Sequence, residues 1–430
     1  MNPTAIDRTQ NIDVSKFRDA KIYIAIFVVL VAIFNPVLRP AADVGITPYY
    51  LIFSIVFIWI MLASSRFRTN TAISLAVLCY GIFAGYFNDT PWQSMAFQSL
   101  KYWQLWTFLG FLSFIQSSFK NGSLVLLKIS YFALYVSLAL AISQEIIAFE
   151  IPTVVNEESY LWINTFFYTP NDLALFLGGM FCVLLISEKT FLEKFILSTL
   201  MLLLNVRNDA KAVIIACVIV YAIFYLLSIA RAFKVKLVYA IPFGMCLIYP
   251  ALYFGINSNI DLYETNFDFY SLFIDPIDRI IHFDPYNLGG SIYDRTDALI
   301  YNIEALYQNN FLGLGPGGSV YLLSLSNFEL LTAKSLHNAL AEFIVEFGVA
   351  GAAVCILGLA LPAFKALRKS SPNRHDAMRV AFFVAMPLLS VSQSSGFISN
   401  YAFWLTAFLV WNGRFDDRYA PKIVNQHYRG

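Results

Sequence analysis

The sequence contains few charged residues. Asp, Glu, Lys and Arg make up 13% of its 430 positions, whereas 58% of the positions are hydrophobic. A soluble globular chain carries about 25% charged residues, and a disordered chain has more charge and fewer aromatic residues. With 40 Phe and 25 Tyr, the chain fits neither class. Its mean hydropathy of +0.63 indicates a protein that crosses a membrane several times.

Basic stripes and cysteine pairs are also lacking. The 29 basic residues nearly cancel the 28 acidic ones and form no stripe, so the sequence predicts no nucleic-acid partner. The cysteines lie far apart within apolar runs and include no C-x-x-C pair, which argues against a disulfide framework and a zinc site. We expect all five to be small core residues: Cys79, Cys182, Cys217, Cys246 and Cys355.

Twelve apolar runs are long enough to cross about 30 Å of hydrocarbon. The sequence therefore predicts an all-α polytopic membrane protein with about twelve transmembrane helices. The runs cover residues 22–38, 49–64, 71–87, 102–119, 129–149, 173–187, 191–206, 212–230, 237–256, 339–364, 380–396 and 398–413. We interpret the first run as a retained signal anchor, although the pair Ala41-Ala42 leaves cleavage open.

The basic residues are distributed unevenly between the two sides of the predicted membrane. With the N-terminus in the cytoplasm, the positive-inside rule is satisfied and both termini are cytoplasmic. Only seven basic residues then face outward: Arg39, Lys101, Arg207, Lys211, Arg279, Arg295 and Lys334. The predicted division of the chain is a cytoplasmic segment 1–21, helices one to nine in 22–256, an outward loop 257–338, helices ten to twelve in 339–413, and a cytoplasmic tail 414–430.

The outward loop between the ninth and tenth predicted helices is long and acidic, with ten Asp or Glu residues against three basic ones. Loops of this length are usually functional or disordered, and its many aromatic residues argue against disorder. Residues 294–310 have the pattern of an amphipathic helix. The segment Gly313–Gly318 ends that helix and lacks the Lys-Ser/Thr of a phosphate-binding loop.

Charged residues are nearly absent from the centres of the predicted helices. A proton-coupled or ion-coupled transporter is expected to bury carboxylates near the midplane. Here Glu145, Glu150, Glu342 and Glu346 lie toward the outer ends of the helices. We therefore expect the working surface to be the outer helix ends and the loop above them.

Two outward residues are candidates for binding or catalysis. Arg207 follows the short seventh run and fits either an interfacial anchor or a diphosphate site, since guanidinium groups bind phosphate oxygens in pairs. His337 begins the tenth helix and is either a polar interfacial residue or a functional one. His282 with Asp284 does not make a metal site.

The order of several short motifs resembles the O-antigen ligase and O-antigen polymerase superfamily. The stretch from Asn310 to Gly351 is similar to the C-terminal signature of that family: Gly-Leu-Gly-Pro-Gly, a spacer, His337-Asn338, two glutamates at positions 342 and 346, and Gly-Val-Ala-Gly. Thr169-Pro170-Asn171 resembles the family's Asn-Pro-Asn stretch, with Thr in place of the first Asn. Arg207 resembles the arginine of its Ser-Arg stretch, with Val206 in place of Ser.

The resemblance implies a GT-C-type membrane glycosyltransferase that uses an undecaprenyl-diphosphate-linked glycan as donor and needs no metal or other cofactor. In that family's terms, Arg207 and Arg295 would bind the diphosphate leaving group, and His337 would orient or deprotonate the acceptor hydroxyl for an inverting transfer. Arg295 alternatively pairs with Asp294 or Asp297. Substrate contacts are expected at Lys211, Asn171, Asn338, Glu342 and Gly315.

The leading hypothesis is a polymerase of lipid-linked oligosaccharide repeat units, for O-antigen, capsule or exopolysaccharide, at the periplasmic face of a bacterial inner membrane. Its partners would be the lipid-linked donor, a glycan acceptor and membrane lipids, with a chain-length regulator as a further candidate. One alternative is a ligase that transfers the glycan to lipid A-core or to a protein. A second is a flippase or transporter without enzymatic activity, and a third is a structural assembly partner.

Overall fold

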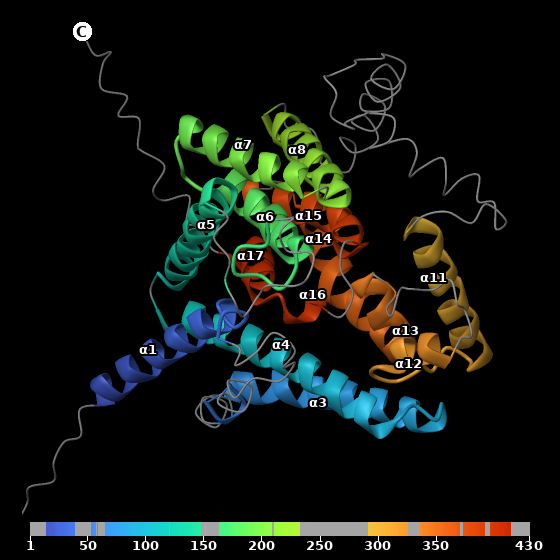
Figure 1. The fold of residues 1–430 in the computed structure, drawn as a ribbon. Helices are drawn as coiled ribbons and strands as arrows, with labels where there is room; N and C mark the ends of the chain where they lie inside the picture. Colours follow the sequence, from blue (N-terminus) through green and yellow to red (C-terminus); the bar gives the residue numbers. More distant parts are fainter. Residues whose placement is uncertain are drawn as a thin grey trace, which may run out of the picture.

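The computed structural model describes residues 14–38, 53–56, 58, 65–119, 121–147, 151, 163–208, 210–232, 291–325, 336, 338–369, 373–391 and 396–413. Every regular element within these residues is a helix, as predicted (Figure 1). The helices are α1 (Val14–Ile33), α3 (Ser65–Phe87), α4 (Trp92–Ser118), α5 (Gly122–Ile147), α6 (Pro170–Ile186), α7 (Phe191–Arg207), α8 (Lys211–Ala232), α11 (Ser291–Gln308), α12 (Gly318–Leu325), α13 (Ala339–Cys355), the π-helical η3 (Ile356–Ala360), α14 (Leu361–Leu367), α15 (Arg374–Val391), α16 (Gly396–Ser399) and α17 (Tyr401–Asn412). The predicted run 237–256 and the loop up to residue 290 lie outside the described residues.

Several helices have the length and composition of membrane spans. Within the described residues, three are long and apolar enough to cross a bilayer: Gly122–Ile147, Lys211–Ile229 and Ala339–Leu367. Shorter apolar helices cover Tyr23–Ile33, Thr71–Phe87 and Pro170–Ile186. The chain therefore has the helices of an all-α membrane protein.

Many helices extend beyond the apolar runs that predicted them. α4 begins at Trp92, ten residues before the run at 102, because its first turns carry polar side chains such as Gln98 that contact other parts of the protein. The long helix that starts at Ala339 contains the π-helical turn η3 directly before Pro362. Proline has no N–H to donate, so the backbone adjusts there.

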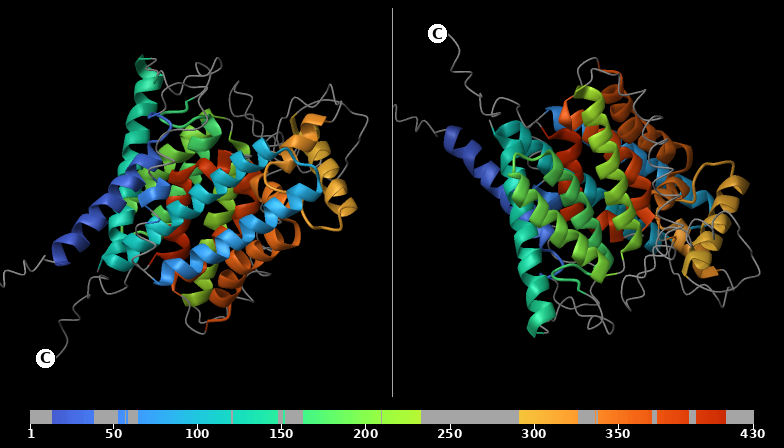
Figure 2. Two further views of the ribbon diagram at one scale, coloured as in Figure 1. Left: turned by 90° about the horizontal axis from the view of Figure 1, so that it is seen from below. Right: turned by 90° about the horizontal axis from the view of Figure 1, so that it is seen from above.

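The core forms around α6, which lies among α5, α7, α8, α15 and α17 (Figures 1 and 2). All residues from Asp172 to Ile186 of α6 are buried, as expected for a helix that is apolar on every side. Gly178 and Gly179 allow close packing: a Cβ on Gly178 would lie 2.9 Å from Val213, and one on Gly179 would meet Thr406 of α17.

Hydrogen bonds group the helix ends into two sets. The end of α7 contacts the segment before α6 through Asn208 and Ile163, and the starts of α6 and α17 meet through Asp172 and Asn400. The opposite end of α17 contacts the end of α4, where Gln116 donates a hydrogen bond to the carbonyl of Asn412. These are the same two sets that the charge distribution assigns to opposite sides of the membrane.

The predicted amphipathic helix is present as α11. Its buried residues Ala298, Asn302 and Leu306 recur every four positions, so they lie on one face, while Ile303 and Tyr307 are exposed. α11 lies at the edge of the assembly beside α12 and α13 (Figures 1 and 2).

The cysteines only partly follow the expectation of core residues. Cys182 and Cys217 are buried, whereas Cys79 is exposed on α3 and Cys355 is half-buried. The expectation is therefore wrong for Cys79, because an apolar run does not show which side of a helix faces the protein interior. Cys246 lies outside the described residues.

Candidate functional site

The segment after α11 contains the glycine-rich stretch Gly313–Gly318 and is attached to α13 by backbone hydrogen bonds. Leu314 N–H donates to the carbonyl of Val345 at 3.0 Å, and Gly315 N–H donates to that of Glu346 at 2.9 Å. Val349 N–H donates to the carbonyl of Phe311 at 3.0 Å. The segment thus lies along one side of α13 as a second, irregular layer.

Polar side chains from the turn between α3 and α4 and from the first turn of α4 bind the other side of this segment. Asn88 Nδ2 donates to the carbonyl of Gly313 at 3.0 Å, and Thr90 Oγ1 donates to that of Leu314 at 2.8 Å. Ser94 Oγ donates to the carbonyl of Gly317 at 3.1 Å. Because these carbonyls are satisfied by protein donors, the segment can be buried without breaking the rule that buried polar groups are paired.

Two glycines, one in this segment and one in α13, have backbone conformations and close contacts that disfavour any residue with a side chain. Gly315 has a φ of +82° and is buried against Gly85 of α3, which a Cβ would overlap. Gly348 has a φ of +54° within α13, and a Cβ there would overlap the carbonyl of Phe311. For Gly315, packing against α3 accounts for the residue type; a substrate contact there stays a prediction.

Glu346 is the main side-chain anchor of the segment. It is fully buried, and its Oε1 accepts hydrogen bonds from Gly317 N–H at 2.8 Å and from Ser319 Oγ at 3.0 Å. Its Oε2 accepts one from the Tyr102 hydroxyl of α4 at 2.9 Å. One carboxyl group therefore joins α4, α12 and α13.

Glu342 lies one turn before Glu346 on the same face of α13. It is also buried, and its Oε1 accepts a long hydrogen bond of 3.4 Å from Gln98 of α4. Its Oε2 has no hydrogen-bond partner. The four-residue spacing of the two glutamates in the sequence is enough to place them on one helix face, but it does not identify Tyr102, Gln98 or Ser319 as their partners.

Asn338 caps the start of α13. Its Oδ1 accepts from Ala341 N–H at 3.1 Å and from Ser390 Oγ of α15 at 3.3 Å. Asn338 therefore fixes the helix start against α15, which is a structural role that is compatible with the predicted substrate contact.

The start of α13 and the loop helix α11 share one apolar cluster. Its buried members are Ala298, Leu306, Leu314, Leu323, Leu336 and Val345. Leu336 directly precedes position 337, and Ala298 lies one turn after position 295 on α11. His337 itself and the side chain of Arg295 lie outside the described part of the structure. One residue close in sequence to each candidate, Leu336 and Ala298, thus belongs to this cluster.

Arg207 lies at a different place, against α5. Its Nε is 3.3 Å from Oε1 of Glu145, and the two side chains are 45% and 53% exposed. Lys211 begins α8 four residues later and is half-buried. Because α5 and α11 lie at opposite edges of the assembly in every view, the structure does not bring Arg207 next to α11 (Figures 1 and 2).

Two residues near the end of α7 that carries Arg207 have unpaired polar groups, and one of them also has a rare backbone conformation. Thr165, in the buried segment before α6, has a φ of +53°, which is rare for a β-branched residue. Its backbone N–H donates to Gln144 of α5 at 2.9 Å, whereas its hydroxyl has no hydrogen-bond partner. Asn205, one turn before Asn208 on α7, is buried and neither atom of its amide is paired. Sequence reasoning missed both residues, since neither belongs to a motif.

Asn171 belongs to the helix start of α6. The preceding Thr169 is the N-cap and accepts from Asp172 N–H at 3.1 Å, and Pro170 occupies the first turn, where its missing N–H costs nothing. Thr-Pro-Asn therefore has a structural explanation as a helix start. The half-buried Asn171 remains a candidate for substrate contact.

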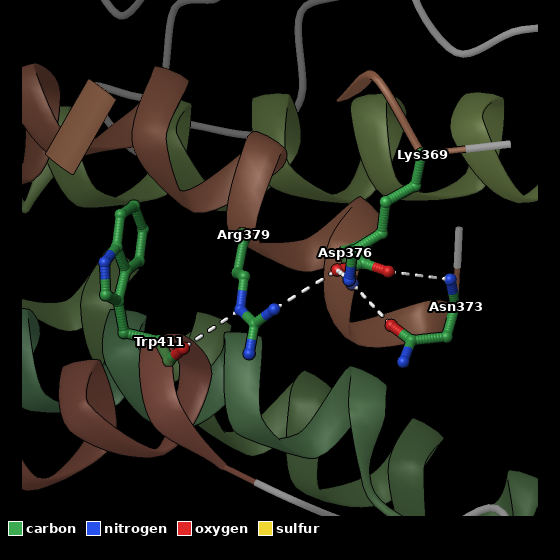
Figure 3. Close-up of polar contacts among 5 residues, drawn as sticks. All are labelled: Lys369, Asn373, Asp376, Arg379 and Trp411. Carbon is green, nitrogen blue, oxygen red and sulfur yellow. Dashed lines mark hydrogen bonds and ion pairs between the residues drawn. The ribbon is translucent and has the colours of Figure 1, made fainter. Parts of the chain in front are cut away.

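A network of ion pairs joins helix ends on the opposite, predicted cytoplasmic side (Figure 3). Asp376 is buried, and its Oδ1 lies 2.7 Å from Lys369 Nζ and 3.2 Å from Arg379 Nη1. Arg379 Nε also donates to the carbonyl of Trp411 at 2.9 Å. Asn373 and Asp376 form reciprocal capping hydrogen bonds at the start of α15. This network fixes α14, α15 and α17 to one another.

In the described part of the chain, no group of three or more His, Cys, Asp or Glu residues is placed to hold a metal ion. In comparisons with known proteins, no family model matches the sequence and no curated protein matches it significantly. The assignment of roles therefore depends on the residues and geometry of this chain.

Proposed function

We propose that this protein is a membrane glycosyltransferase that polymerises undecaprenyl-diphosphate-linked oligosaccharide repeat units at the periplasmic face of a bacterial inner membrane, with a GT-C-type architecture of about twelve transmembrane helices. The observation that carries the proposal is the attachment of α11 and the glycine-rich segment to α13. A loop that only connects two helices has no need for such a buried, hydrogen-bonded attachment.

The attachment supports a composite site at the outer helix ends. Arg295 is on the helix α11, His337 directly follows the buried Leu336, and both segments belong to one apolar cluster. A site held by packed helices keeps its groups in fixed positions, which reduces the cost of orienting two large substrates. The attachment is therefore the kind of support that a transfer reaction between two lipid-linked glycans requires.

In the proposed reaction, His337 takes the proton of the acceptor hydroxyl while that oxygen forms a bond to the anomeric carbon of the donor. The bond from this carbon to the phosphate oxygen breaks, and its electron pair goes to the diphosphate. Arg295 stabilises the negative charge that develops there. Attack from the opposite side inverts the anomeric centre, and the chemistry needs no metal because guanidinium groups supply the positive charge.

We keep Arg207 as a candidate phosphate-binding group on the α5 side, at the opposite edge of the assembly from α11. Its ion pair with Glu145 is exposed at both side chains, so a diphosphate can compete with the carboxylate for the guanidinium. The unpaired amide of Asn205, two residues before Arg207 on α7, is an additional hydrogen-bonding group.

The proposal is tested by the polysaccharide profile of a deletion strain complemented with wild type, Arg207→Ala, Arg295→Ala or His337→Ala at matched expression. Glu304→Gln, an exposed change on the same loop helix, is the matched control. The deletion strain should carry single repeat units on the normal acceptor. The control should restore long chains, whereas the three alanine variants should not.

Two other results would overturn the proposal. Long chains that accumulate on undecaprenyl diphosphate in the deletion strain would identify a ligase. Full complementation by all three alanine variants would refute the catalytic assignment and favour transport of a lipid-linked oligosaccharide or a structural role.

A further inference from the structure

The buried carboxyl groups of Glu342 and Glu346 take part in no step of the proposed transfer reaction. Both carboxyl groups are within one turn of the same helix and both are buried, at 1% and 0% exposure. Two negative charges so close together in a medium of low dielectric constant repel each other strongly, and each also loses its hydration. The pair is therefore stable only when one of the two carboxyl groups carries a proton.

The hydrogen bonds favour Glu346 as the charged member of the pair. Glu346 accepts from Gly317 N–H, Ser319 Oγ and Tyr102 hydroxyl, and three donors are the environment of an ionised carboxylate. Glu342 accepts only the 3.4 Å contact from Gln98, and its Oε2 is unpaired. An unpaired buried oxygen is far less costly on a neutral acid than on a carboxylate.

Among the described residues, the other charged and titratable groups that face the pair come from α4. Tyr102 donates to Glu346, and Lys101 interacts electrostatically with Glu342. The Lys101 Nζ lies 4.6 Å from the centre of the Phe97 ring. From the loop side, the side chain that contacts the pair within the described residues is Ser319 of α12, which donates to Glu346. A serine hydroxyl does not titrate at ordinary pH.

We propose that Glu342 is a proton-binding site, and that the bound proton keeps the glycine-rich segment attached to α13 and α4. When Glu342 loses its proton, its negative charge repels Glu346. The Glu346 carboxylate then leaves its contacts with Gly317 and Ser319, which are the side-chain link between α13 and the segment that leads into α12. The inference does not depend on the proposed transferase activity.

The direction of the pH dependence follows from proton binding. In the attached state Glu342 is buried and retains its proton, whereas a detached state admits water and lets the carboxyl group ionise. The attached state therefore binds more protons, and attachment weakens as pH rises. For one proton, the attachment equilibrium changes by up to about tenfold per pH unit in the range where only the attached state is protonated.

Hydrogen exchange of the backbone amides in residues 309–319 tests this directly, in full-length protein reconstituted in lipid nanodiscs over a range of pH. Rates are corrected for the intrinsic pH dependence of exchange. Wild-type protection should fall as pH rises, by up to about tenfold per unit. Glu342→Gln cannot ionise, so its protection should stay constant. Glu346→Gln lacks the charged acceptor and should be less protected at every pH.

An exposed glutamate provides the matched control, since Glu145→Gln should retain the wild-type pH profile. Infrared spectroscopy provides a second measurement that needs no conformational change. Wild type at neutral pH should show the carbonyl stretching band of a buried protonated carboxylic acid, and Glu342→Gln should lose it. Equal pH profiles for wild type and Glu342→Gln, or an unchanged band in that variant, would overturn the proposal. A band that disappears on addition of sodium or potassium chloride would show a cation site instead, and would also overturn it.

Discussion

Gly348 is the residue at which α13 departs from helical geometry to receive the glycine-rich segment. Its φ of +54° is in a region that residues with a side chain rarely adopt, and a Cβ there would overlap the carbonyl of Phe311. The neighbouring Val349 N–H consequently points to Phe311 instead of continuing the helix ladder. The kink and the attachment of the loop are thus one feature.

Replacing this glycine should be costly. Gly348→Ala combines an unfavourable backbone conformation with a steric overlap, and we expect a loss of about 1–3 kcal/mol in stability. Gly358→Ala, on the same long helix, is the control, because a Cβ at Gly358 meets nothing within 4 Å. Thermal unfolding in detergent compares the two. An equal melting temperature for both variants would contradict the role assigned to Gly348.

Arg207 and Glu145 offer a test of whether this arginine serves the substrate or anchors the helix end. The pair is exposed, so its contribution to stability should be about 0–1 kcal/mol. If Arg207 binds the diphosphate, Glu145→Gln removes a competitor and should keep or increase polymer synthesis, whereas Arg207→Ala should abolish it. Quantitative gel profiles at matched expression provide the measurement. Equal loss in both variants would show that only the ion pair matters.

Sequence reasoning identified some of these residues and not others. Glu342 and Glu346 are four positions apart, so helical geometry alone places them on one face. Their contacts Gln98 and Tyr102 are each 244 positions earlier in the chain. No local pattern indicates which helices pack together, so these partners were found only from the structure.

Among the elements, α6 is the best example of a helix start set by local sequence. Thr169 accepts a hydrogen bond from the backbone of Asp172, and Pro170 occupies the first turn. Asn400 of α17 donates to the carbonyl of Asp172 at 2.8 Å, which ties this start to another helix. The cap thus contributes both to α6 and to the packing of the central helices.

The capping role of Thr169 can be measured with two substitutions. Thr169→Ala removes the acceptor and should cost about 1 kcal/mol, whereas Thr169→Ser keeps a hydroxyl oxygen and should cost much less. Chemical denaturation of the purified protein in detergent gives both values. A larger loss for the serine variant than for the alanine variant would refute the cap.

Element positions were largely predictable and element ends were not. The amphipathic pattern at 294–310 became α11 over Ser291–Gln308, ending before the glycine-rich segment as expected. α4, by contrast, begins ten residues before its apolar run, because polar side chains in its first turns are satisfied by contacts with α13. Hydropathy detects the part of a helix that lies in lipid, and misses the part whose polar groups are paired inside the protein.

For the whole molecule, we expect the two sets of helix ends to lie on opposite sides of a membrane. In a cysteine-free variant, Gln93→Cys at the start of α4 should react with a membrane-impermeant maleimide added outside spheroplasts. Glu188→Cys, between α6 and α7, should react only after permeabilisation. Both side chains are exposed, so burial does not limit labelling. The opposite pattern would invert the predicted orientation.

The central claim is that the protein transfers glycan between lipid-linked substrates at its outer helix ends. Its most direct test is to reconstitute the purified protein in liposomes with a defined undecaprenyl-diphosphate-linked repeat unit and to measure chain length and released undecaprenyl diphosphate. Wild type should produce chains of two or more repeats, with one undecaprenyl diphosphate released per bond formed, while His337→Ala and Arg295→Ala should produce none. Movement of intact lipid-linked glycan across the bilayer without any new glycosidic bond would contradict the account.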